Sequence, residues 1–233
     1  MAKKLNTKVR TLGIIMDGNR RWARERGLPA LEGHRQGAEK LREVLNWSRA
    51  AGIQTVIAYA FSTENWRRKK TEISFLFKLF RRFLKTEIDS LVADKIIFRC
   101  VGERNSLPDD IQSDIAAAEA RTKNLGPQTL VLLVSYGGRA EIVAAAKAFA
   151  RRHADKLDVV GESEFEQCLW TAGLSDPDLI IRTGGAARLS NFLPWQSVYS
   201  ELFFTATYWP ALSHQEFTAI LAEAANRDRR FGR

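Results

Sequence analysis

The sequence predicts an α/β fold, with one domain built on a central, mostly parallel β-sheet flanked by helices. Three observations support this prediction. Short apolar segments typical of strands buried on both faces alternate with longer segments of helical periodicity. Apolar residues make up 45% of the 233, enough for one sizeable core, and no repeat or long Pro/Gly/Ser linker interrupts the chain. We therefore expect residues 1–233 to form a single domain, with a flexible basic N-terminus at 1–8 and a basic C-terminal tail at 227–233.

The first elements follow from apolar runs and from the residues that end them. Residues 11–16 (TLGIIM) are predicted as a buried strand, which the turn-forming sequence DGN ends. Leu41 and Val44 lie at helical spacing inside 37–51, so this segment is predicted as a helix. Residues 55–61 (TVIAYAF) are rich in β-branched and aromatic side chains, which favours a second strand.

The middle of the chain repeats this alternation. Residues 72–93 have helical periodicity and an apolar face wider than the usual stripe, suited to a core or to the wall of an apolar tunnel. An apolar strand is predicted at 95–101, then a helix at 108–123, whose proline stands where a first helical turn tolerates it. A fourth strand is predicted at 129–135 and a helix at 139–153.

Strands at 178–182 and 200–204 and a helix at 213–226 complete the predicted elements. Ligands of parallel α/β sheets bind beyond the carboxyl ends of the strands. We therefore expect the functional site at these ends, with an apolar tunnel leading away from them.

The charge balance favours an acidic partner, because 36 Lys and Arg stand against 27 Asp and Glu, a formal charge of +9. Basic residues cluster after strands, which favours a pocket for a small anion over a nucleic-acid-binding stripe. No RNA-binding Lys/Arg-Gly-Phe/Tyr motif or helix-turn-helix pattern is present, so no nucleic-acid partner is expected. The motifs GxxxxGK[ST], GxGxxG, HExxH, GxSxG and DDxxD are absent as well.

The location expected from the sequence is the cytoplasm. Cys100 and Cys168 lie far apart without a CxxC pair, which fits a reducing compartment rather than a disulfide scaffold or a cysteine zinc site. The N-terminal residues lack the apolar segment of a signal peptide, and no apolar run approaches the roughly 18 residues of a membrane span.

The end of the first strand combines a carboxylate with a glycine and arginines. Gly18 lets backbone N–H groups approach a phosphate, and Arg20 and Arg21 can bind one bidentately. Asp17 would repel a bare diphosphate but suits a Mg²⁺ ion held between carboxylate and phosphates. A capping aspartate in a turn beside solvated arginines is the alternative.

Two further segments are candidates. His34 lies in GHRQG, just ahead of the helix predicted from residue 37 and near a natural anion site, although a single histidine also often packs or caps. Residues 62–66 (STENW) follow the second strand and precede four consecutive basic residues. Such a segment suits a mobile lid, and the alternative is a solvated loop.

A second anion pocket is indicated by residues 182–191. Arg182 and Arg188 place two guanidinium groups, and Ser190 a hydroxyl, around a flexible Gly-Gly pair. Together with the first pocket and an acidic pair, Asp17 and Glu201, this pattern favours an enzyme that joins two phosphorylated substrates.

In order and spacing these segments resemble the motifs of the cis-prenyltransferases, whose bacterial type is undecaprenyl diphosphate synthase. The resemblance extends from about Thr11 to Phe231, nearly the whole chain. The matching segments are IMDGNRRWA (15–23), GHRQG (33–37), YAFSTENW (59–66), IRTGG (181–185), RLSNF (188–192) and YSELFF (199–204).

The resemblance implies a homodimeric, Mg²⁺-dependent isoprenyl transferase that condenses isopentenyl diphosphate with an allylic diphosphate. Farnesyl diphosphate is the expected primer, and undecaprenyl diphosphate, a precursor of the cell-wall carrier lipid, is the expected product. By the same resemblance Asp17, Asn65 and His34 are catalytic, and Asp17 and Glu201 hold the metal. The residues implied in substrate binding are Gly18, Asn19, Arg20, Arg21, Trp22, His34, Ser62, Glu64, Trp66, Arg68, Arg182, Arg188 and Ser190.

Three positions depart from the family pattern. Ala30 stands where the family usually has an arginine, Lys69 where it has a proline, and Ala186-Ala187 replaces the Glu-x of a Gly-Glu-x-Arg segment. These changes are either tolerated drift or a sign of altered substrate choice, such as short-chain or irregular prenyl coupling. Ala60, a small residue expected to face the tunnel, favours a long product.

Two alternatives of another class stay open. One is a catalytically silent partner subunit of the same fold, which the retained site residues argue against. The other is a basic domain that binds RNA or a membrane surface. The basic C-terminal tail also suits peripheral contact with anionic lipid, near which a lipid product would be released.

Overall fold

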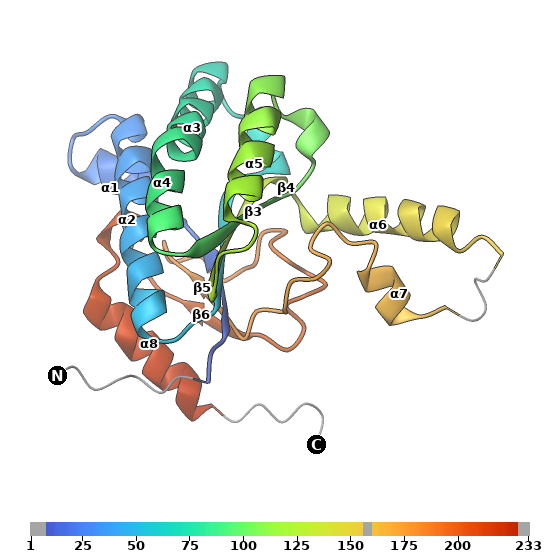
Figure 1. Cartoon of the computed structure of the whole chain (residues 1–233). Coiled ribbons are helices and arrows are strands. Elements are labelled where there is room, and N and C mark those ends of the chain that lie inside the picture. Colours follow the sequence, from blue (N-terminus) through green and yellow to red (C-terminus); the bar gives the residue numbers. More distant parts are fainter. Residues whose placement is uncertain (1–7, 156–159, 228–233) are drawn as a thin grey trace.

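Six strands form one parallel sheet in the computed structural model, which describes residues 8–155 and 160–227 (Figure 1). Their order across the sheet is β3-β4-β2-β1-β5-β6. The strands are β1 (Thr11–Ile15), β2 (Thr55–Ser62), β3 (Ile96–Val101), β4 (Gln128–Tyr136), β5 (Leu179–Arg182) and β6 (Glu201–Phe204). The predicted α/β class is confirmed, and each predicted strand is found to within one residue at either end.

The central strand β1 is paired with both of its neighbours in a register that brings the carboxyl ends of β1 and β5 side by side. It pairs with β2 on one side and β5 on the other, so that Leu12 lies opposite both Val56 and Leu179. Ile15, at its carboxyl end, lies opposite Arg182, the last residue of β5. Because the strands are parallel, the residues that follow them meet along one edge of the sheet, where the sequence predicts the site.

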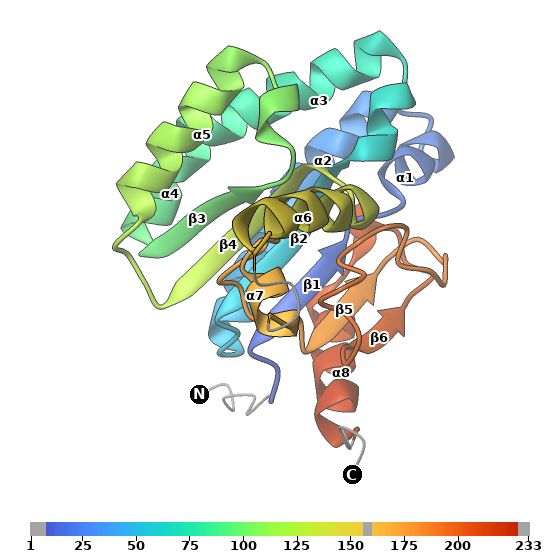
Figure 2. The same ribbon diagram turned by 90° about the vertical axis from the view of Figure 1, so that its right-hand side faces the viewer.

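Helices cover mainly one face of the sheet (Figure 1, Figure 2). The helices that share this core are α2 (Ala30–Ala50), α3 (Lys70–Arg82), α4 (Ile88–Ala93), α5 (Asp109–Thr122) and α8 (His214–Asn226). The other face is covered chiefly by the irregular segments 167–178 and 183–200 on either side of β5, and Phe192 and Leu193 of the second segment are fully buried. From this side α6 (Gly138–Arg152) extends away from the sheet, with α7 (Glu162–Glu166) beside it (Figure 1).

The first helical region differs from the prediction. A short helix, α1 (Asn19–Glu25), precedes α2, and α2 begins well before its predicted start at Gly37. Glycine disfavours helices, but here it allows two segments to cross closely. A Cβ at Gly33 would lie 2.0 Å from the Asn19 carbonyl oxygen, and one at Gly37 would lie 2.2 Å from Oδ1 of the same residue. The expectation that His34 lies ahead of a helix is therefore wrong, since His34 lies inside α2.

The long helix predicted at 72–93 is present as three consecutive helical segments. A π-helical turn (Phe83–Glu87) separates α3 from α4 without a break in the chain's helical course. Such turns are frequent at functional sites. Here the turn follows α3 along the wall of the cavity described below, which Phe83 lines.

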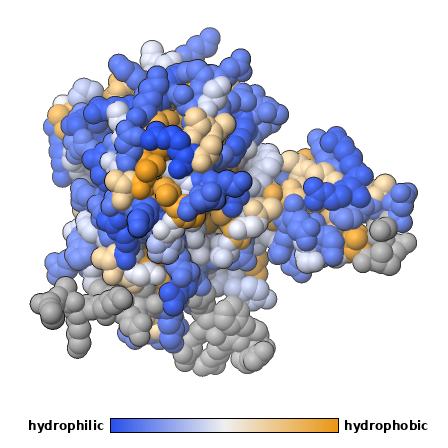
Figure 3. All heavy atoms as spheres, viewed as in Figure 1, coloured by the Kyte–Doolittle hydropathy of each residue, from blue (hydrophilic) through white to orange (hydrophobic). Residues whose placement is uncertain are grey.

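The face seen in Figure 3 is largely hydrophilic, with hydrophobic residues gathered in the middle of the helical layer. None of the helices in the described ranges is both long and apolar enough to cross a bilayer. The basic segments expected at 1–8 and 227–233 lie outside the described residues, apart from Lys8 and Arg227.

Candidate active site

A cavity of about 840 Å³ opens at the carboxyl edge of the sheet. Its polar lining comes from strand ends, the segments after them and α2: Asp17, Asn19, His34, Ser62, Glu64, Asn65, Arg68, Arg139, Arg182, Ser190 and Asn191. Its apolar lining includes Leu41, Leu76, Phe77, Leu79, Phe80, Phe83, Leu132 and Val134. Since α3 starts near the strand ends and runs away from them, the cavity changes from polar at its mouth to apolar along its length. This apolar lining fits the predicted tunnel, which itself remains a prediction.

A second, mainly basic cavity of about 680 Å³ lies beside the first. It is lined by Met16, Asp17, Gly18, Asn19, Arg20, Arg21, Arg24, Gly27, Leu28, Ala30, His34 and Arg68. The residues that line both cavities are Met16, Asp17, Asn19, His34 and Arg68. The two cavities therefore meet at the end of β1.

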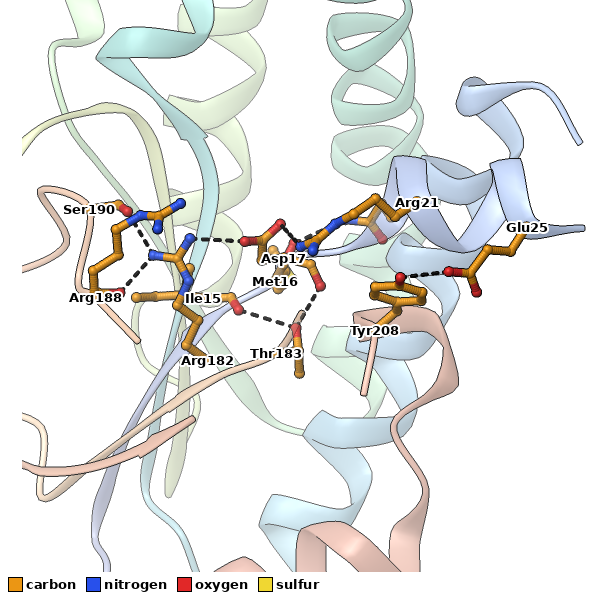
Figure 4. A network of polar contacts seen from close by, with 11 residues as sticks. Ile15, Met16, Asp17, Arg21, Glu25, Arg182, Thr183, Arg188, Ser190 and Tyr208 are labelled. Atoms are coloured by element: carbon orange, nitrogen blue, oxygen red, sulfur yellow. Dashed lines mark hydrogen bonds and ion pairs between the residues drawn. The ribbon is translucent and has the colours of Figure 1, made fainter. Parts of the chain in front are cut away.

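Arg182 joins the two anion-binding segments predicted from the sequence (Figure 4). This residue is 5% exposed, and its Nη2 donates to Oδ2 of Asp17 at 2.9 Å. Its Nη1 donates to Ser190 Oγ at 2.7 Å and to the Arg188 carbonyl oxygen at 2.6 Å. Arg21 donates to the other carboxylate oxygen of Asp17 at 3.2 Å. The carboxylate of Asp17 thus lies between guanidinium groups from both segments, as Figure 4 shows.

The backbone of Asp17 is held from the last third of the chain. Thr183 Oγ1 donates to the Asp17 carbonyl oxygen at 2.7 Å, and the Trp209 backbone N–H donates to the same oxygen at 3.0 Å. Gly18 has a φ of 104°, and a Cβ there would lie 2.6 Å from Cδ1 of Tyr208, so only glycine fits. Gly18, not Asp17, is the N-cap residue of α1. The carboxylate of Asp17 is therefore left to face the cavities.

His34 lies where the cavities meet, and its side chain is 10% exposed. Its Nε2 is 3.4 Å from Oε1 of Glu72, but the contact lacks hydrogen-bond geometry. The same carboxylate accepts from Arg68 at 2.8 Å and lies 3.7 Å from Arg20. Burial lowers the pKa of His34, and the Arg68 guanidinium lowers it further, whereas Glu72 acts in the opposite direction. The imidazole is therefore neutral at neutral pH when no anion is bound.

We expect His34 to make the protein less stable at mildly acid pH. Because folding disfavours the charged imidazole, the unfolded chain binds the proton more tightly, and the free energy of unfolding falls as the pH drops below about 6.5. The His34→Gln variant lacks this contribution. Chemical denaturation of both proteins across this pH range should show the wild type losing stability relative to the variant on the acid side. Parallel stability curves would contradict the lowered pKa.

Three of the buried polar atoms at the cavities have no hydrogen-bond partner among the described residues. They are Asn19 Oδ1, His34 Nε2 and Arg182 Nε. Buried polar groups are nearly always paired in folded proteins. Asn19 Oδ1 lies against Gly37 of α2, so only His34 Nε2 and Arg182 Nε are candidates to pair with a polar group of a ligand.

The predicted lid forms a 3₁₀ turn (Thr63–Arg67) over the cavity mouth. Asn65 Oδ1 accepts from the Ser62 backbone N–H at 3.1 Å, which closes the turn. Glu64 Oε1 accepts from Asn191 Nδ2 at 2.8 Å, which ties the turn to the segment that carries Ser190. The lid and the second anion-binding segment are therefore connected.

Trp66, Trp22 and Arg188 do not line either cavity. The indole of Trp66 is partly exposed and packs against aromatic rings of β2 and α3. The Arg26 guanidinium lies over the Trp22 ring. Arg188 contributes a carbonyl oxygen to the Arg182 guanidinium. Substrate contacts for these three residues remain predictions.

Glu201 is not brought to Asp17 within one chain. It begins β6 opposite Leu179, the first residue of β5, whereas Asp17 follows the carboxyl end of β1. Its carboxylate accepts from Arg227 at 3.0 Å. Among the described residues, no group of three or more His, Cys, Asp or Glu side chains is placed to hold a metal ion. Shared metal binding by Glu201 and Asp17 would need a second copy of the chain and remains a prediction.

Three residues at the site were not assigned a role from the sequence. Arg139 lines the first cavity and follows the end of β4, so the strand-end rule alone points to it. Asn191 holds this segment, since its Oδ1 accepts from the Arg139 N–H at 2.8 Å and its carbonyl oxygen from the Gly138 N–H at 2.9 Å. Glu72 is one acid among many on an amphipathic helix, and no sequence signal separates it from the others.

Known proteins resemble this chain along nearly its whole length. The profile of a family described as "Putative undecaprenyl diphosphate synthase" matches residues 15–232. An isoprenyl transferase of Thermotoga maritima is 41% identical over 223 residues, 95% of this chain and 95% of that protein. A ditrans,polycis-undecaprenyl-diphosphate synthase ((2E,6E)-farnesyl-diphosphate specific) of Legionella pneumophila is 42% identical over 224 residues, 95% of this chain and 94% of that protein.

Solved structures share the fold. Lavandulyl diphosphate synthase from Lavandula x intermedia, solved with dimethylallyl diphosphate, has a TM-score of 0.92 at 33% identity, over 97% of this chain and 98% of that one. A probable undecaprenyl diphosphate synthase from Campylobacter jejuni has a TM-score of 0.81 at 34% identity, over 97% and 99% of the two chains. Both the sequence and the fold of this chain are therefore similar to those of prenyl diphosphate synthases.

Proposed function

The chain belongs to the undecaprenyl diphosphate synthase family of prenyltransferases, and from this we propose that it condenses isopentenyl diphosphate with an allylic diphosphate to build a Z-polyprenyl diphosphate. Farnesyl diphosphate is the proposed primer, and undecaprenyl diphosphate, a precursor of the cell-wall carrier lipid, is the proposed product. One observation carries the proposal. Two cavities suited to diphosphates meet at Asp17, and one of them continues between apolar side chains.

The allylic diphosphate is assigned to the basic second cavity, beside Arg20, Arg21 and Arg24. Its prenyl chain would lie along Leu76 and Phe80 in the first cavity. When the bond between the allylic carbon and its diphosphate breaks, negative charge grows on the departing group. The guanidinium groups beside it would stabilise that charge in the transition state. His34 lies where the cavities meet, its Nε2 has no hydrogen-bond partner in the part of the chain that the structure describes, and it is placed to donate to the same group.

The residues at the junction fit a Mg²⁺ ion that arrives with a diphosphate. In such sites Mg²⁺ keeps several waters and takes one or two carboxylates together with substrate phosphates. Asp17 offers one carboxylate where the cavities meet, and Arg21 and Arg182 each donate to one of its oxygens. When bound, the ion would neutralise charge on the leaving diphosphate.

Isopentenyl diphosphate is assigned to the mouth of the first cavity, where Arg182, Ser190 and Arg139 lie. Its double bond would supply the electron pair for the new carbon–carbon bond, and loss of a proton would leave the Z double bond. Asn65, held in the closed turn by the Ser62 N–H, lines the same mouth. Both substrates would then reach each other beside Asp17.

We expect Arg182→Ala to raise the KM for isopentenyl diphosphate by about 10- to 100-fold, the effect of losing charge-assisted hydrogen bonds. The KM for the allylic substrate should change much less, because its cavity is lined by other arginines. Steady-state kinetics with each substrate varied in turn measures both constants. Arg81→Ala is a matched control, because this arginine pairs with Asp110 outside both cavities. Equal changes in both KM values would mean that the two pockets are assigned wrongly.

A second candidate function is short-chain or irregular prenyl coupling by the same fold. The high TM-score with lavandulyl diphosphate synthase favours it. Two departures from the family pattern also favour it. Ala186-Ala187 lies in the segment that carries Arg182 and Ser190, and Ala30 lines the basic cavity. Ala60 argues for a long product, since this small residue lines the first cavity and leaves room for a growing chain.

A product assay tests the proposal. The purified protein is incubated with Mg²⁺, radiolabelled isopentenyl diphosphate and dimethylallyl, geranyl or farnesyl diphosphate, and the dephosphorylated products are sized. A ladder of long Z-polyprenols from farnesyl diphosphate is the expected result. A short or branched product, above all from dimethylallyl diphosphate alone, would support the second candidate. No product with any primer would support a catalytically silent subunit instead.

A homodimer is part of the proposal. Val143 on the protruding α6, together with Val198 and Tyr199, exposes more than half of its surface. Exposed large apolar side chains are typical of protein–protein interfaces where they form one patch, and the proposed dimer would bury these three. Sedimentation of the purified protein should show twice the chain mass.

Peripheral membrane contact through the basic C-terminal tail is also proposed. Unchanged binding to anionic liposomes after truncation of the tail would contradict it.

A further inference from the structure

Ser135 occupies an unusual backbone position at the end of β4. It is fully buried and has a φ of 50°, in the left-handed region that residues other than glycine and asparagine rarely adopt. It is also an extra residue in the strand pairing, because Val134 pairs with Phe61 and Tyr136 with Ser62. A bulge of this kind near an active site often re-aims a side chain.

The hydroxyl of Ser135 is aimed at the lid. Its Oγ accepts from the indole Nε1 of Trp66 at 2.9 Å. On its other side it lies 2.7 Å from Ser106 Oγ, which itself donates to the Glu103 carbonyl oxygen at 2.6 Å. Since the only proton of the Ser106 hydroxyl is used in that bond, the Ser135 hydroxyl must donate to Ser106. The hydrogen bonds therefore run in one direction, from the indole to the Glu103 carbonyl.

The indole of Trp66 is also fixed by packing. Its ring centroid lies 5.2 Å from that of Phe61 and 5.4 Å from that of Phe77, and both phenylalanines line the apolar cavity. Trp66 belongs to the same 3₁₀ turn as Asn65, which it follows directly in the chain. The indole therefore connects the lid to the cavity wall on one side and to Ser135 on the other.

We propose that Ser135 is a positioning residue that anchors the lid through Trp66 and so holds Asn65 and Arg68 at the cavity mouth. The kinetic consequence of this inference rests on the proposed function. The anchoring of the lid by the hydrogen bond between Ser135 and Trp66 does not depend on it. A strained backbone position persists only where its surroundings fix it. A glycine would relieve the strain at residue 135, and serine is present because its hydroxyl bonds the lid.

Four variants separate the hydroxyl from the strain. Ser135→Ala keeps the strained backbone and loses the hydroxyl, and Ser135→Gly loses both. Ser135→Asn keeps a donor and an acceptor in a residue that tolerates a positive φ. Ser106→Ala is the matched control, because it removes the neighbouring hydroxyl and leaves the bond between Trp66 and Ser135 in place.

The anchor is measured without turnover. In protein labelled with ¹⁵N at its six tryptophan indoles, Trp66→Phe assigns the Trp66 resonance. Ser135→Ala and Ser135→Gly should shift this Nε1–H resonance upfield and speed its exchange with water, whereas Ser106→Ala and Ser135→Asn should preserve it. An unchanged resonance in Ser135→Ala would overturn the anchor.

The consequence is measured by kinetics. Ser135→Ala and Ser135→Gly should lower kcat/KM by about three- to tenfold, the effect of one hydrogen bond, and Ser135→Asn should restore it. In a Trp66→Phe background Ser135→Ala should have no further effect. Wild-type kinetics in Ser135→Gly would assign the effect to backbone strain and overturn the proposal. If no primer gives product, the proposed function fails, and titration with inorganic diphosphate replaces turnover. Ser135→Ala should then weaken diphosphate binding by a similar factor, and unchanged affinity would overturn the positioning role.

Discussion

Replacing Asp17 by alanine should lower turnover by about 10²- to 10³-fold, the loss typical of removing one group that stabilises charge in a transition state. Asp17 is the carboxylate at which the two cavities meet, and it pairs with an arginine from each anion-binding segment. The variant should still fold, because Arg182 keeps its hydrogen bonds to Ser190 and to the Arg188 carbonyl oxygen. The product assay and a thermal unfolding curve on the same sample measure both properties.

Two further variants make the Asp17 result specific. Asp17→Asn keeps the size of the side chain and removes its charge, so it should be nearly as inactive as alanine. Asp94→Ala removes an exposed carboxylate that pairs with Arg49 away from both cavities, and its turnover should be unchanged. Turnover of Asp17→Asn near that of the wild type in Mg²⁺ would rule out a metal-binding role for this residue.

Replacing Glu141 by alanine should lower the free energy of unfolding by about 3 kcal/mol or more, since it leaves several buried donors without an acceptor. Glu141 is fully buried in α6. One of its carboxylate oxygens accepts from the Thr171 N–H at 2.9 Å and the Thr171 hydroxyl at 2.8 Å. The other accepts from the Tyr136 hydroxyl at 2.5 Å and from Gln196 at 3.1 Å. These contacts join β4 to the irregular segment that carries Ser190.

Thermal unfolding of the Glu141→Ala variant should show a midpoint about 6–12 °C below that of the wild type, the shift expected for a chain of this length. Glu162→Ala is the matched control, because this glutamate of α7 is exposed. Glu141→Gln keeps the shape and one acceptor oxygen, so its midpoint should lie between those of the wild type and the alanine variant. Equal midpoints for Glu141→Ala and Glu162→Ala would show that the buried contacts add nothing to stability.

The position of the site could be predicted because parallel strands buried on both faces have a simple sequence pattern. An apolar run such as 11–15 stops at the residue where the strand leaves the core, and the polar residues after it must lie at the carboxyl edge. The positions of Asp17 and Arg182 at this edge could both be predicted in this way, although 165 residues separate them in the chain. The sheet then brings them within hydrogen-bond distance.

Contacts that depend on a helix crossing or on a backbone angle could not be predicted. Gly33 and Gly37 weaken the helical pattern locally, and only the close approach of Asn19 explains their presence inside α2. The left-handed conformation of Ser135 leaves no signal in a strand-like sequence. The buried role of Glu141 could not be predicted either. A carboxylate in a helix usually faces water, and the partners of Glu141 come from distant parts of the chain.

Asp17, His34 and Arg68 line both cavities, so two diphosphates bound there cannot bind independently of each other. Each ligand changes the charge that the other meets, and by thermodynamic reciprocity each must change the affinity of the other by the same factor. Without a divalent cation each diphosphate should weaken the binding of the other, because two like charges compete for the same few donors. The headgroups of the two proposed substrates are also identical, so the shared wall cannot tell one substrate from the other. Discrimination between primer and extender units must then come from the hydrocarbon tails, and only the longer tail gains from the apolar part of the first cavity.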